Sequence, residues 1–564
     1  MRFRTGFSVA LLAALTAAAA CDRSPPPGAQ PAASASGRSV RPQGPAGDPT
    51  LPEELEPKAE PEAKGEEDAG AKELDWKGPW FVVTSVAAAV YPNPEFDKDK
   101  KLGYVRNGGR VPVQEKPVST KSCSGGWYQI VTGGYVCGNL GTTDLEHPQV
   151  KFALKAPDLD AVLPYQYARN AKNGTPLYRS VPSREQMYKY EPYLPGAKKA
   201  KEKEEQESDD DDDKTVRRAS VVTDGGAPDR PQIDRALADA GILTQPTDGG
   251  SDEPEKPWWQ QENAKDKLHE VTLEQLEAEG DDILAKRMVA GFYIAVDKTF
   301  SWNGRTWYKS TKGLVAPADR FWITAGSKFQ GVELGGDFKL PIAWVYGGRK
   351  TAPTYEIEEG SSSPKPAKAI EAFTAIQLTG KSQEVGGTRY LETKDNTWIK
   401  AIHVRETHPG PPPKDLKPNE RWIDVNLSEQ TLVAFEGGRP VYATMVSTGK
   451  HSSIKDKDHS TPTGAWRIRE KHVTTTMDGN GTAAGDLPYS IEDVPYVMYF
   501  HRSYAVHGAF WHRNFGVQMS HGCVNLAPLD AKHLFFFADP PMPKGWHGAW
   551  SSGDRPGSLV VIHD

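Results

Sequence analysis

Short stretches of alternating apolar and polar residues, separated by glycine-containing turns, recur along most of the chain. From Trp80 the pieces "VAAAVYPNP", "LGYVRNGGRVPVQEK" and "GGWYQIVTGGYVCGNL" follow one another, and similar pieces return at residues 173–183 and 285–317. A weaker copy covers residues 373–406. Alternation with a period of two is typical of strands with one buried face. The pattern therefore predicts a mainly β chain built from several small modules.

A different pattern begins after the proline-rich stretch at residues 408–420. Alternating residues there surround two predicted turns, one at Asn426 and one at Gly437–Gly438. Strands joined in this way form a β-meander. Because a proline-rich stretch is typical of a domain boundary, we expect a separate C-terminal domain over residues 420–564.

A charged insertion at residues 190–284 divides the second of the predicted modules. It contains the run "KEKEEQESDDDDDK", which cannot bury a core and is expected to be disordered. Thr272 and Gln275 have the spacing of a capping box. This spacing predicts one helix that begins at residue 272.

The first residues have the features of an export signal. Arg2 and Arg4 precede an apolar run that is too short to span a membrane as a helix. The run ends in small residues before Cys21, which resembles the lipobox of bacterial lipoproteins, where that cysteine is acylated. Ordinary cleavage after an Ala-x-Ala site is the alternative and would leave an unanchored secreted protein. We expect a signal peptide over residues 1–21, a lipid anchor in a membrane of the cell envelope facing the periplasm, and a flexible tether over residues 22–75.

The charge of the chain argues against one class of partner, and its cysteines point to one reactive residue. The formal net charge is −7 and no basic stripe is present, so nucleic acid is not an expected partner. The chain has 4 cysteines. Cys123 and Cys137 lie in one short β-rich segment, and we expect them on neighbouring strands of a hairpin and joined by a disulfide. Cys523 is then left over, and an unpaired thiol in an exported protein points to reactivity.

Histidines surround this cysteine in the stretch "YAVHGAFWHRNFGVQMSHGCVNL". A thiol with a pKa of ~8.5 needs a base to act as a nucleophile at neutral pH. His507, at the end of an apolar run, can approach Cys523 from a neighbouring strand. His521 is the other candidate, but it lies only two residues from Cys523, which makes close contact with the sulfur awkward. Consecutive amides around Gly522 could bind an oxyanion, so these residue types indicate a cysteine acyl-transfer site.

The C-terminal segment resembles the YkuD-type catalytic domain of the L,D-transpeptidases. The resemblance rests on "STGK" and "TPTG" paired with "SHGCVN", and it covers residues 420–564. It implies a mostly β, sandwich-like domain in which Cys523 is the nucleophile and His507 the proton donor and acceptor, with no metal and no cofactor. The 12 residues between His507 and Ser520 are fewer than is usual in the family. We therefore expect a shortened active-site loop.

The resemblance also implies a reaction on the stem peptides of peptidoglycan. The thiol would attack a stem tetrapeptide before its terminal D-Ala, form a thioester, release D-Ala and pass the acyl group to an amine. A hydrolase of the L,D-carboxypeptidase type would use the same residues with water as the acceptor. A non-catalytic, wall-binding lipoprotein is a further alternative, because the preceding modules resemble bacterial SH3-like barrels. These barrels are expected over residues 76–150, 151–345 and, more weakly, 346–410.

Further residues of the same segment complete the expected site. Backbone amides near His521, Gly522 and Cys523 would form the oxyanion hole, and Ser520 and Asn525 belong to the same motif. Four residues could line the substrate cleft or, equally, serve only in packing: Tyr499, Gly508, Trp511 and His512.

Overall fold

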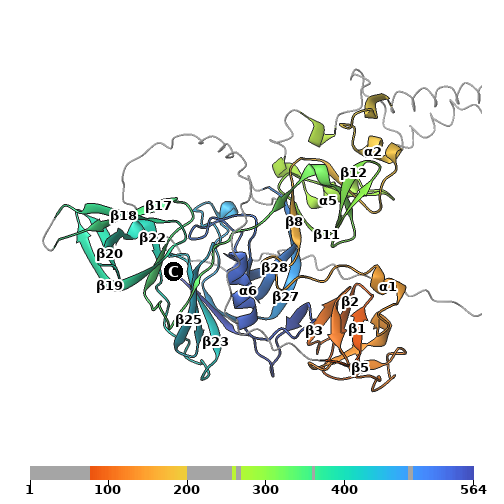
Figure 1. The fold of residues 1–564 in the computed structure, drawn as a ribbon, viewed down its shortest axis with the longest axis horizontal. Helices are drawn as coiled ribbons and strands as arrows, with labels where there is room; N and C mark the ends of the chain where they lie inside the picture. Colours follow the sequence, from red (N-terminus) through yellow and green to blue (C-terminus); the bar gives the residue numbers. More distant parts are fainter. Residues whose placement is uncertain (1–75, 200–256, 262–267, 359–361, 481–486) are drawn as a thin grey trace, which may run out of the picture. The chain divides into compact units, whose positions relative to one another are not determined.

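The computed structural model of the chain describes residues 76–199, 257–261, 268–358, 362–480 and 487–564. The predicted signal peptide with Cys21, the tether and the centre of the charged insertion lie outside these residues. Strands predominate over helices in the described parts (Figure 1), which confirms the mainly β prediction. No helix in these parts is long and apolar enough to cross a membrane.

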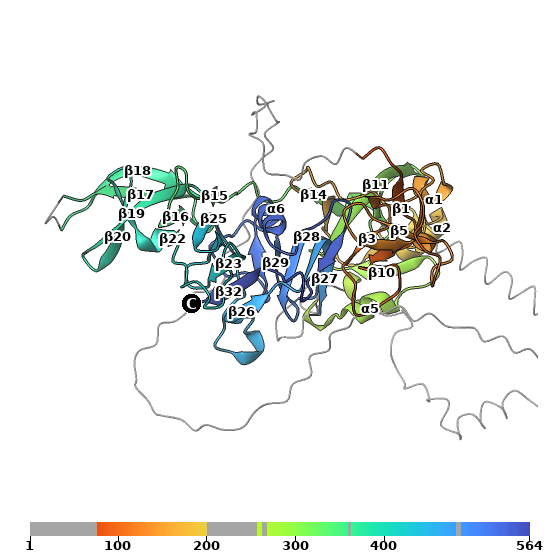
Figure 2. The same ribbon diagram turned by 90° about the horizontal axis from the view of Figure 1, so that it is seen from below.

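The C-terminal domain consists of strands around a single long helix. Its elements in chain order are β15 (Val332–Glu333), β23 (Arg421–Asn426), β24 (Thr431–Glu436), β25 (Arg439–Met445), β26 (Gly464–Arg467), β27 (Glu470–Gly479), β28 (Tyr489–His501), β29 (Tyr504–Gly508), β30 (Val524–Leu526), α6 (Pro528–Phe537), β31 (Gly548–Trp550) and β32 (Leu559–His563). The first sheet has the order β15–β25–β24–β23–β32–β26, and the second contains β27, β28, β29 and β30. Helix α6 lies beside β28 (Figure 2).

One apolar core joins the two sheets and the helix. It includes Ile423 of the first sheet, Met498 and Val506 of the second, and Leu534 of α6, all of which are fully buried. Two sheets that share a core in this way form a sandwich-like domain. The predicted β-meander is confirmed, because β23, β24 and β25 pair in antiparallel order.

The first module contains the disulfide. Its strands are β1 (Trp80–Val83), β2 (Ala87–Val90), β3 (Gly103–Arg106), β4 (Arg110–Pro112), β5 (Trp127–Gln129), β6 (Tyr135–Cys137) and β7 (Gly141–Thr142), and helix α1 (Pro148–Lys151) follows. β5 and β6 form a hairpin, and Cys137 lies at the end of β6. Cys123 lies in the turn before β5, not on a strand as expected, and the structure joins it to Cys137 by a disulfide. The Gly138 amide donates to the carbonyl oxygen of Gly126 at 2.7 Å, which holds this turn beside the end of β6.

The second module consists of β8 (Gln166–Asn170), β9 (Thr175–Tyr178), α2 (Arg184–Tyr190), α5 (Leu273–Ala278), β10 (Leu284–Met288), β11 (Tyr293–Trp302), β12 (Arg305–Ser310), β13 (Val315–Pro317) and β14 (Phe321–Thr324). The predicted helix is confirmed as α5, and Thr272 and Gln275 form its capping box. The first residue of β11, Tyr293, pairs in parallel with Ile491 of β28 in the C-terminal domain.

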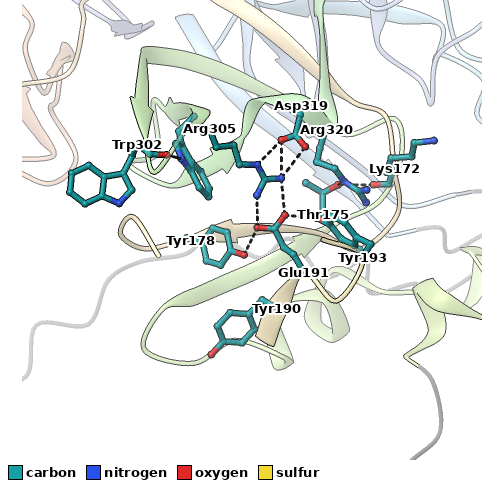
Figure 3. A network of polar contacts seen from close by, with 12 residues as sticks. Lys172, Thr175, Tyr178, Tyr190, Glu191, Tyr193, Trp302, Arg305, Asp319 and Arg320 are labelled. Carbon is teal, nitrogen blue, oxygen red and sulfur yellow. Dashed lines mark hydrogen bonds and ion pairs between the residues drawn. The ribbon is translucent and has the colours of Figure 1, made fainter. Parts of the chain in front are cut away.

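A buried polar network fixes the residues after α2 to the strands of the second module (Figure 3). The Glu191 carboxylate is fully buried and accepts hydrogen bonds from the Tyr178 hydroxyl at 2.8 Å and from the Arg305 guanidinium at 3.0 and 2.9 Å. Arg305 also donates two hydrogen bonds to Asp319. A buried charge is stable only when it is paired and hydrogen-bonded. The network therefore has a structural role inside this module.

The third module is a seven-stranded sheet in the order β18–β17–β21–β20–β19–β16–β22. Its strands are β16 (Ile342–Val345), β17 (Thr351–Glu356), β18 (Lys365–Glu371), β19 (Ala375–Val385), β20 (Thr388–Thr393), β21 (Trp398–Lys400) and β22 (Val404–Glu406). No sheet in the described residues closes into a barrel, so the SH3-like barrels are not confirmed. In the first module, the edge strand β3 pairs with β31 of the C-terminal domain. In the second module, β11 pairs with β8 and β12 and meets β28 of the C-terminal domain at a single residue pair. The pairing with β31 covers an edge of β3 that would otherwise be open.

Candidate active site

Cys523 and His507 come from two neighbouring parallel strands. β29 and β30 pair with His507 opposite Asn525, and Cys523 directly precedes β30. Val524 packs in the sandwich core, whereas Cys523 packs on the opposite face of the sheet together with Ala505. Since side chains alternate along a strand, His507 lies on the same face as Ala505. The fold therefore brings the predicted thiol and the predicted base to one face of the sheet.

The Cys523 thiol is half-buried and protonated. Its Sγ lies 3.8 Å from the carbonyl oxygen of Ser503. Burial raises the pKa of the Cys523 thiol to about 11, although a backbone hydrogen bond from Ala505 opposes the shift. A carbonyl oxygen can only accept a hydrogen bond, so the contact fits an S–H donor. The site therefore holds a thiol rather than a thiolate before substrate binds.

His507 is neutral as well. It is 2% exposed, and burial lowers its pKa to about 4. The ring Nδ1 lies 3.2 Å from the carbonyl oxygen of Gly508 and must donate to it, because the carbonyl cannot donate. Nδ1 thus carries the proton, and Nε2 is the basic nitrogen. Gly508, expected as a cleft residue, orients the ring through its backbone.

Two loops of the C-terminal domain hold the motif "SHGCVN". The Thr461 hydroxyl donates to the carbonyl oxygen of Gly522 at 2.8 Å and accepts a hydrogen bond from the Gly449 amide at 2.9 Å. Ser447 and Asn525 exchange two backbone hydrogen bonds of 2.9 Å. The motifs "STGK" and "TPTG" supply these residues. Ser447, Gly449 and Thr461 were not expected as site residues, although the motifs that contain them carry the family resemblance.

A tight turn at Gly522 precedes the nucleophile. Gly522 has a φ of 119°, and a Cβ atom there would lie 2.4 Å from the ring of Tyr504, so only glycine fits. The Ser520 hydroxyl donates to the carbonyl oxygen of Cys523 and accepts a hydrogen bond from the Gly522 amide at 3.1 Å. The Gly522 amide is therefore engaged inside the turn. Ser520 thus closes the turn. Among the three amides expected in the oxyanion hole, those of His521 and Cys523 are better candidates than that of Gly522.

Two tyrosines of β28 face the thiol. Burial raises the pKa of Tyr489 to about 12, and the negative charge that Cys523 would carry as a thiolate adds to the shift. The pKa of Tyr499 is raised by the same two causes. His521 is exposed, and its ring lies against those of Tyr489 and His459, with centroids 5.4 and 4.7 Å away. Tyr499 was expected near the site, whereas Tyr489 was missed.

The residues between His507 and Ser520 contact the base and the motif. The rings of Trp511 and His507 lie 5.7 Å apart. His512 Nε2 lies 3.0 Å from the side-chain nitrogen of Asn525, and burial lowers the pKa of His512 to about 4. Within the described residues, no group of three or more His, Cys, Asp or Glu side chains is arranged to hold a metal ion.

Residues 420–562 match the YkuD family model, the L,D-transpeptidase catalytic domain. The predicted resemblance of the C-terminal domain is thereby confirmed. Protein YciB of Bacillus subtilis (strain 168), provisionally named an L,D-transpeptidase, is 26% identical over 131 residues, which are 22% of this chain and 62% of YciB. The chain therefore spans less than two thirds of the length of this relative.

Solved structures of L,D-transpeptidases are similar to 26% of the chain. A mutant of the Enterococcus faecium L,D-transpeptidase is 24% identical, with 26% of this chain and 50% of that chain covered and a TM-score of 0.19. The catalytic domain of the E. faecium enzyme acylated by ertapenem is 23% identical, with 26% of this chain and 100% of that chain covered and a TM-score of 0.20.

Proposed function

We propose that this protein is a peptidoglycan L,D-transpeptidase in which Cys523 is the nucleophile and His507 the proton acceptor and donor. The observation that carries the proposal is the pairing of β29 with β30, which puts a neutral imidazole and a protonated thiol on one face of a sheet. The match of residues 420–562 to the YkuD model supports the choice of reaction.

The pKa values of His507 and Cys523 indicate when the thiol loses its proton. Burial lowers the pKa of His507 to about 4 and raises that of Cys523 to about 11, so both groups favour their neutral forms in the free protein. Nε2 of His507 therefore takes the proton as Sγ attacks the carbonyl carbon before the terminal D-Ala. Amides of His521 and Cys523 would stabilise the oxyanion that forms.

The intermediate then collapses to products. The imidazolium of His507 donates its proton to the departing amine, so that D-Ala leaves and the stem remains bound to Sγ as a thioester. An amine of a second stem attacks the thioester, and His507 takes one of its protons and returns it to Sγ. An amide bond between two stems forms and the thiol is regenerated.

We further propose that the chain acts in the cell envelope through a lipid on Cys21, with the preceding modules, SH3-like in sequence, contacting the wall. A fatty-acid probe supplied to growing cells should label the wild-type protein and not the Cys21→Ser variant. Equal labelling and equal membrane fractionation of the two proteins would rule out the lipid at Cys21.

The reaction is tested with a synthetic stem tetrapeptide and the purified protein. Intact mass should show the acyl group on Cys523 as D-Ala is released, and a second stem with a free side-chain amine should yield a cross-linked dimer. A tripeptide as the main product, with that amine present, would indicate the hydrolase instead. Turnover by the Cys523→Ala variant would contradict both reactions.

A further inference from the structure

The active-site segment, residues 509–519, connects the strand of the base to the motif of the nucleophile. Its ends pair with the C-terminal domain: the Ala509 amide donates to Leu526, and the Met519 amide donates to Thr448, at 2.8 and 2.9 Å. Between these ends, the segment is contacted by residues of two other modules.

The second module contacts the segment at Phe510, which is 2% exposed. The Phe510 ring stacks on that of Tyr167 at 3.9 Å and meets that of Tyr293 edge-on at 5.4 Å. Phe510 also contacts Trp511 at 5.2 Å, and Trp511 contacts His507 at 5.7 Å. A continuous row of aromatic rings thus runs from the second module to the base. Aromatic pairs at these distances add attraction beyond their buried area and restrict ring orientation.

The third module contacts the segment a few residues further on. The Gly347 amide donates to the carbonyl oxygen of Phe515 at 3.0 Å, and Nε of Arg405 donates to that of Gly516 at 2.7 Å. The Arg405 guanidinium lies over the ring of Tyr346, 4.1 Å from its centroid, which fixes the donor in place. Gly516 has a φ of 87°, and a Cβ atom there would lie 2.5 Å from Tyr346. The backbone of the segment therefore fits closely against the third module.

We propose that the second and third modules position the base by holding the active-site segment from two sides, with Tyr167 and Arg405 as positioning residues. Both residues act through the segment, Tyr167 through the aromatic row and Arg405 through the backbone. A displacement of about 1 Å in a reacting group can cost on the order of 100-fold in rate. The role of His507 in this inference rests on the proposed function, whereas the hold on the segment does not.

Two variants with matched controls test this inference in the full-length protein. Tyr167→Leu removes the stacking on Phe510 together with the hydroxyl that donates to the carbonyl oxygen of Asp493. Its control is Tyr178→Leu, which removes an equally buried tyrosine of the same module and its hydrogen bond to Glu191 (Figure 3). Arg405→Ala removes the hydrogen bond to Gly516. Its control is Arg389→Ala, which removes an arginine of the same module that pairs with Glu406 at 3.2 Å.

Two measurements are compared within each pair of variants. Hydrogen exchange of residues 509–519 should become about tenfold faster in Tyr167→Leu and Arg405→Ala than in their controls. The kcat for D-Ala release should fall about tenfold in these two variants while KM changes less than twofold, since the hold acts on the base and not on substrate binding. Arg405→Lys, which retains a donor for Gly516, should recover part of the rate.

Equal exchange in the variants and their controls would overturn the proposal, and so would faster exchange without a loss of kcat. If the wild-type protein releases no D-Ala, the proposed function fails by itself. In that case hydrogen exchange of residues 509–519 alone tests whether the two modules hold the segment. Unchanged exchange in Tyr167→Leu and Arg405→Ala would overturn that part of the proposal.

Discussion

The two halves of the active site are supported in different ways. The nucleophile lies in a turn that Thr461 and Ser447 hold from within the C-terminal domain. The base contacts a segment that Tyr167 and Arg405 hold from two other modules. The turn of the nucleophile is thus held from within one domain, whereas the segment beside the imidazole is also held by the second and third modules.

The largest effects are expected at the reacting pair itself. Cys523→Ala should abolish thioester formation and D-Ala release, because no other group can form the bond to the acyl carbon. His507→Ala should slow acylation by about 10²–10⁴-fold, the usual cost of losing a general base. The rate of D-Ala release measures both effects, and circular dichroism checks the fold.

His521→Ala is the matched control for His507→Ala. Its ring is exposed and lies against His459 and Tyr489, so its loss should cost much less than the loss of His507. A greater loss of rate in His521→Ala than in His507→Ala would show that the base is misassigned.

The pH dependence of Cys523 alkylation distinguishes a neutral thiol and imidazole at Cys523 and His507 from a thiolate–imidazolium ion pair. Since the pKa of the thiol is raised to about 11, its thiolate fraction and its rate with iodoacetamide should rise about tenfold per pH unit from pH 7 to pH 10. The experiment uses Cys21→Ser protein, in which Cys523 is the only thiol outside the disulfide. A rate that is constant between pH 6 and pH 8 would mean that the thiolate already exists at neutral pH.

Thr461→Val tests the local support of the nucleophile. It removes the hydroxyl that connects Gly449 to Gly522 while the volume stays the same. Two buried hydrogen bonds lose a partner, at about 1–3 kcal/mol, so D-Ala release should fall by about 10–100-fold. Thr461→Ser should recover most of the rate.

Thr444→Val is the control for this loss. Thr444 is equally buried, and its hydroxyl donates to Asp530 at 2.6 Å, away from the motif. This variant should lower the melting temperature without lowering the rate of the folded protein. An equal loss of rate in Thr444→Val and Thr461→Val would mean that the Thr461 effect reflects stability alone.

The smallest effect is expected at the junction of the second module with β28. Glu492 is buried, accepts a hydrogen bond from the Ala295 amide at 3.2 Å, and has a pKa raised to about 7. The folded protein thus binds a proton that the unfolded chain has released between pH ~4.5 and 7, so this group lowers stability as the pH rises through that window.

Glu492→Gln removes the ionisation. The melting temperature of Glu492→Gln minus that of wild type should increase by a few degrees from pH 5 to pH 8. This increase corresponds to a change of about 1–3 kcal/mol in the difference between their free energies of unfolding. Glu333→Gln, at an exposed position of β15, should show no such change. A constant difference between Glu492→Gln and wild type across this range would show that Glu492 is ionised in the folded protein.

The features that were predictable from the sequence are local ones. The meander of β23–β25 and the cap of α5 follow from alternation and from two residues three positions apart. The partners of the strands were not predictable, because alternation specifies a buried face and not the strand that covers an edge. The pairings of β3 with β31 and of β11 with β28 therefore became visible only in the structure.

The residues of the active site likewise fall into those that local sequence could predict and those that it could not. Cys523 and His507 could be proposed because a lone thiol among histidines, within a family motif, is a local observation. Tyr167 and Arg405 carry no such mark, since one is a tyrosine among many and the other lies more than a hundred residues before the segment that it contacts. Their relevance depends on tertiary contacts that no periodicity encodes.

The pairing of β3 with β31 also constrains the order in which the molecule can mature. Synthesis proceeds from the N-terminus, so Gly103 and Tyr104 are made long before their partners Ala549 and Gly548. Contacts between such distant parts of a chain form slowly, and an edge strand stays open to wrong partners until its own arrives. The strands made last close edges that the strands made first have left open. A nascent chain is therefore expected to keep this edge of β3 unpaired until β31 has been synthesised.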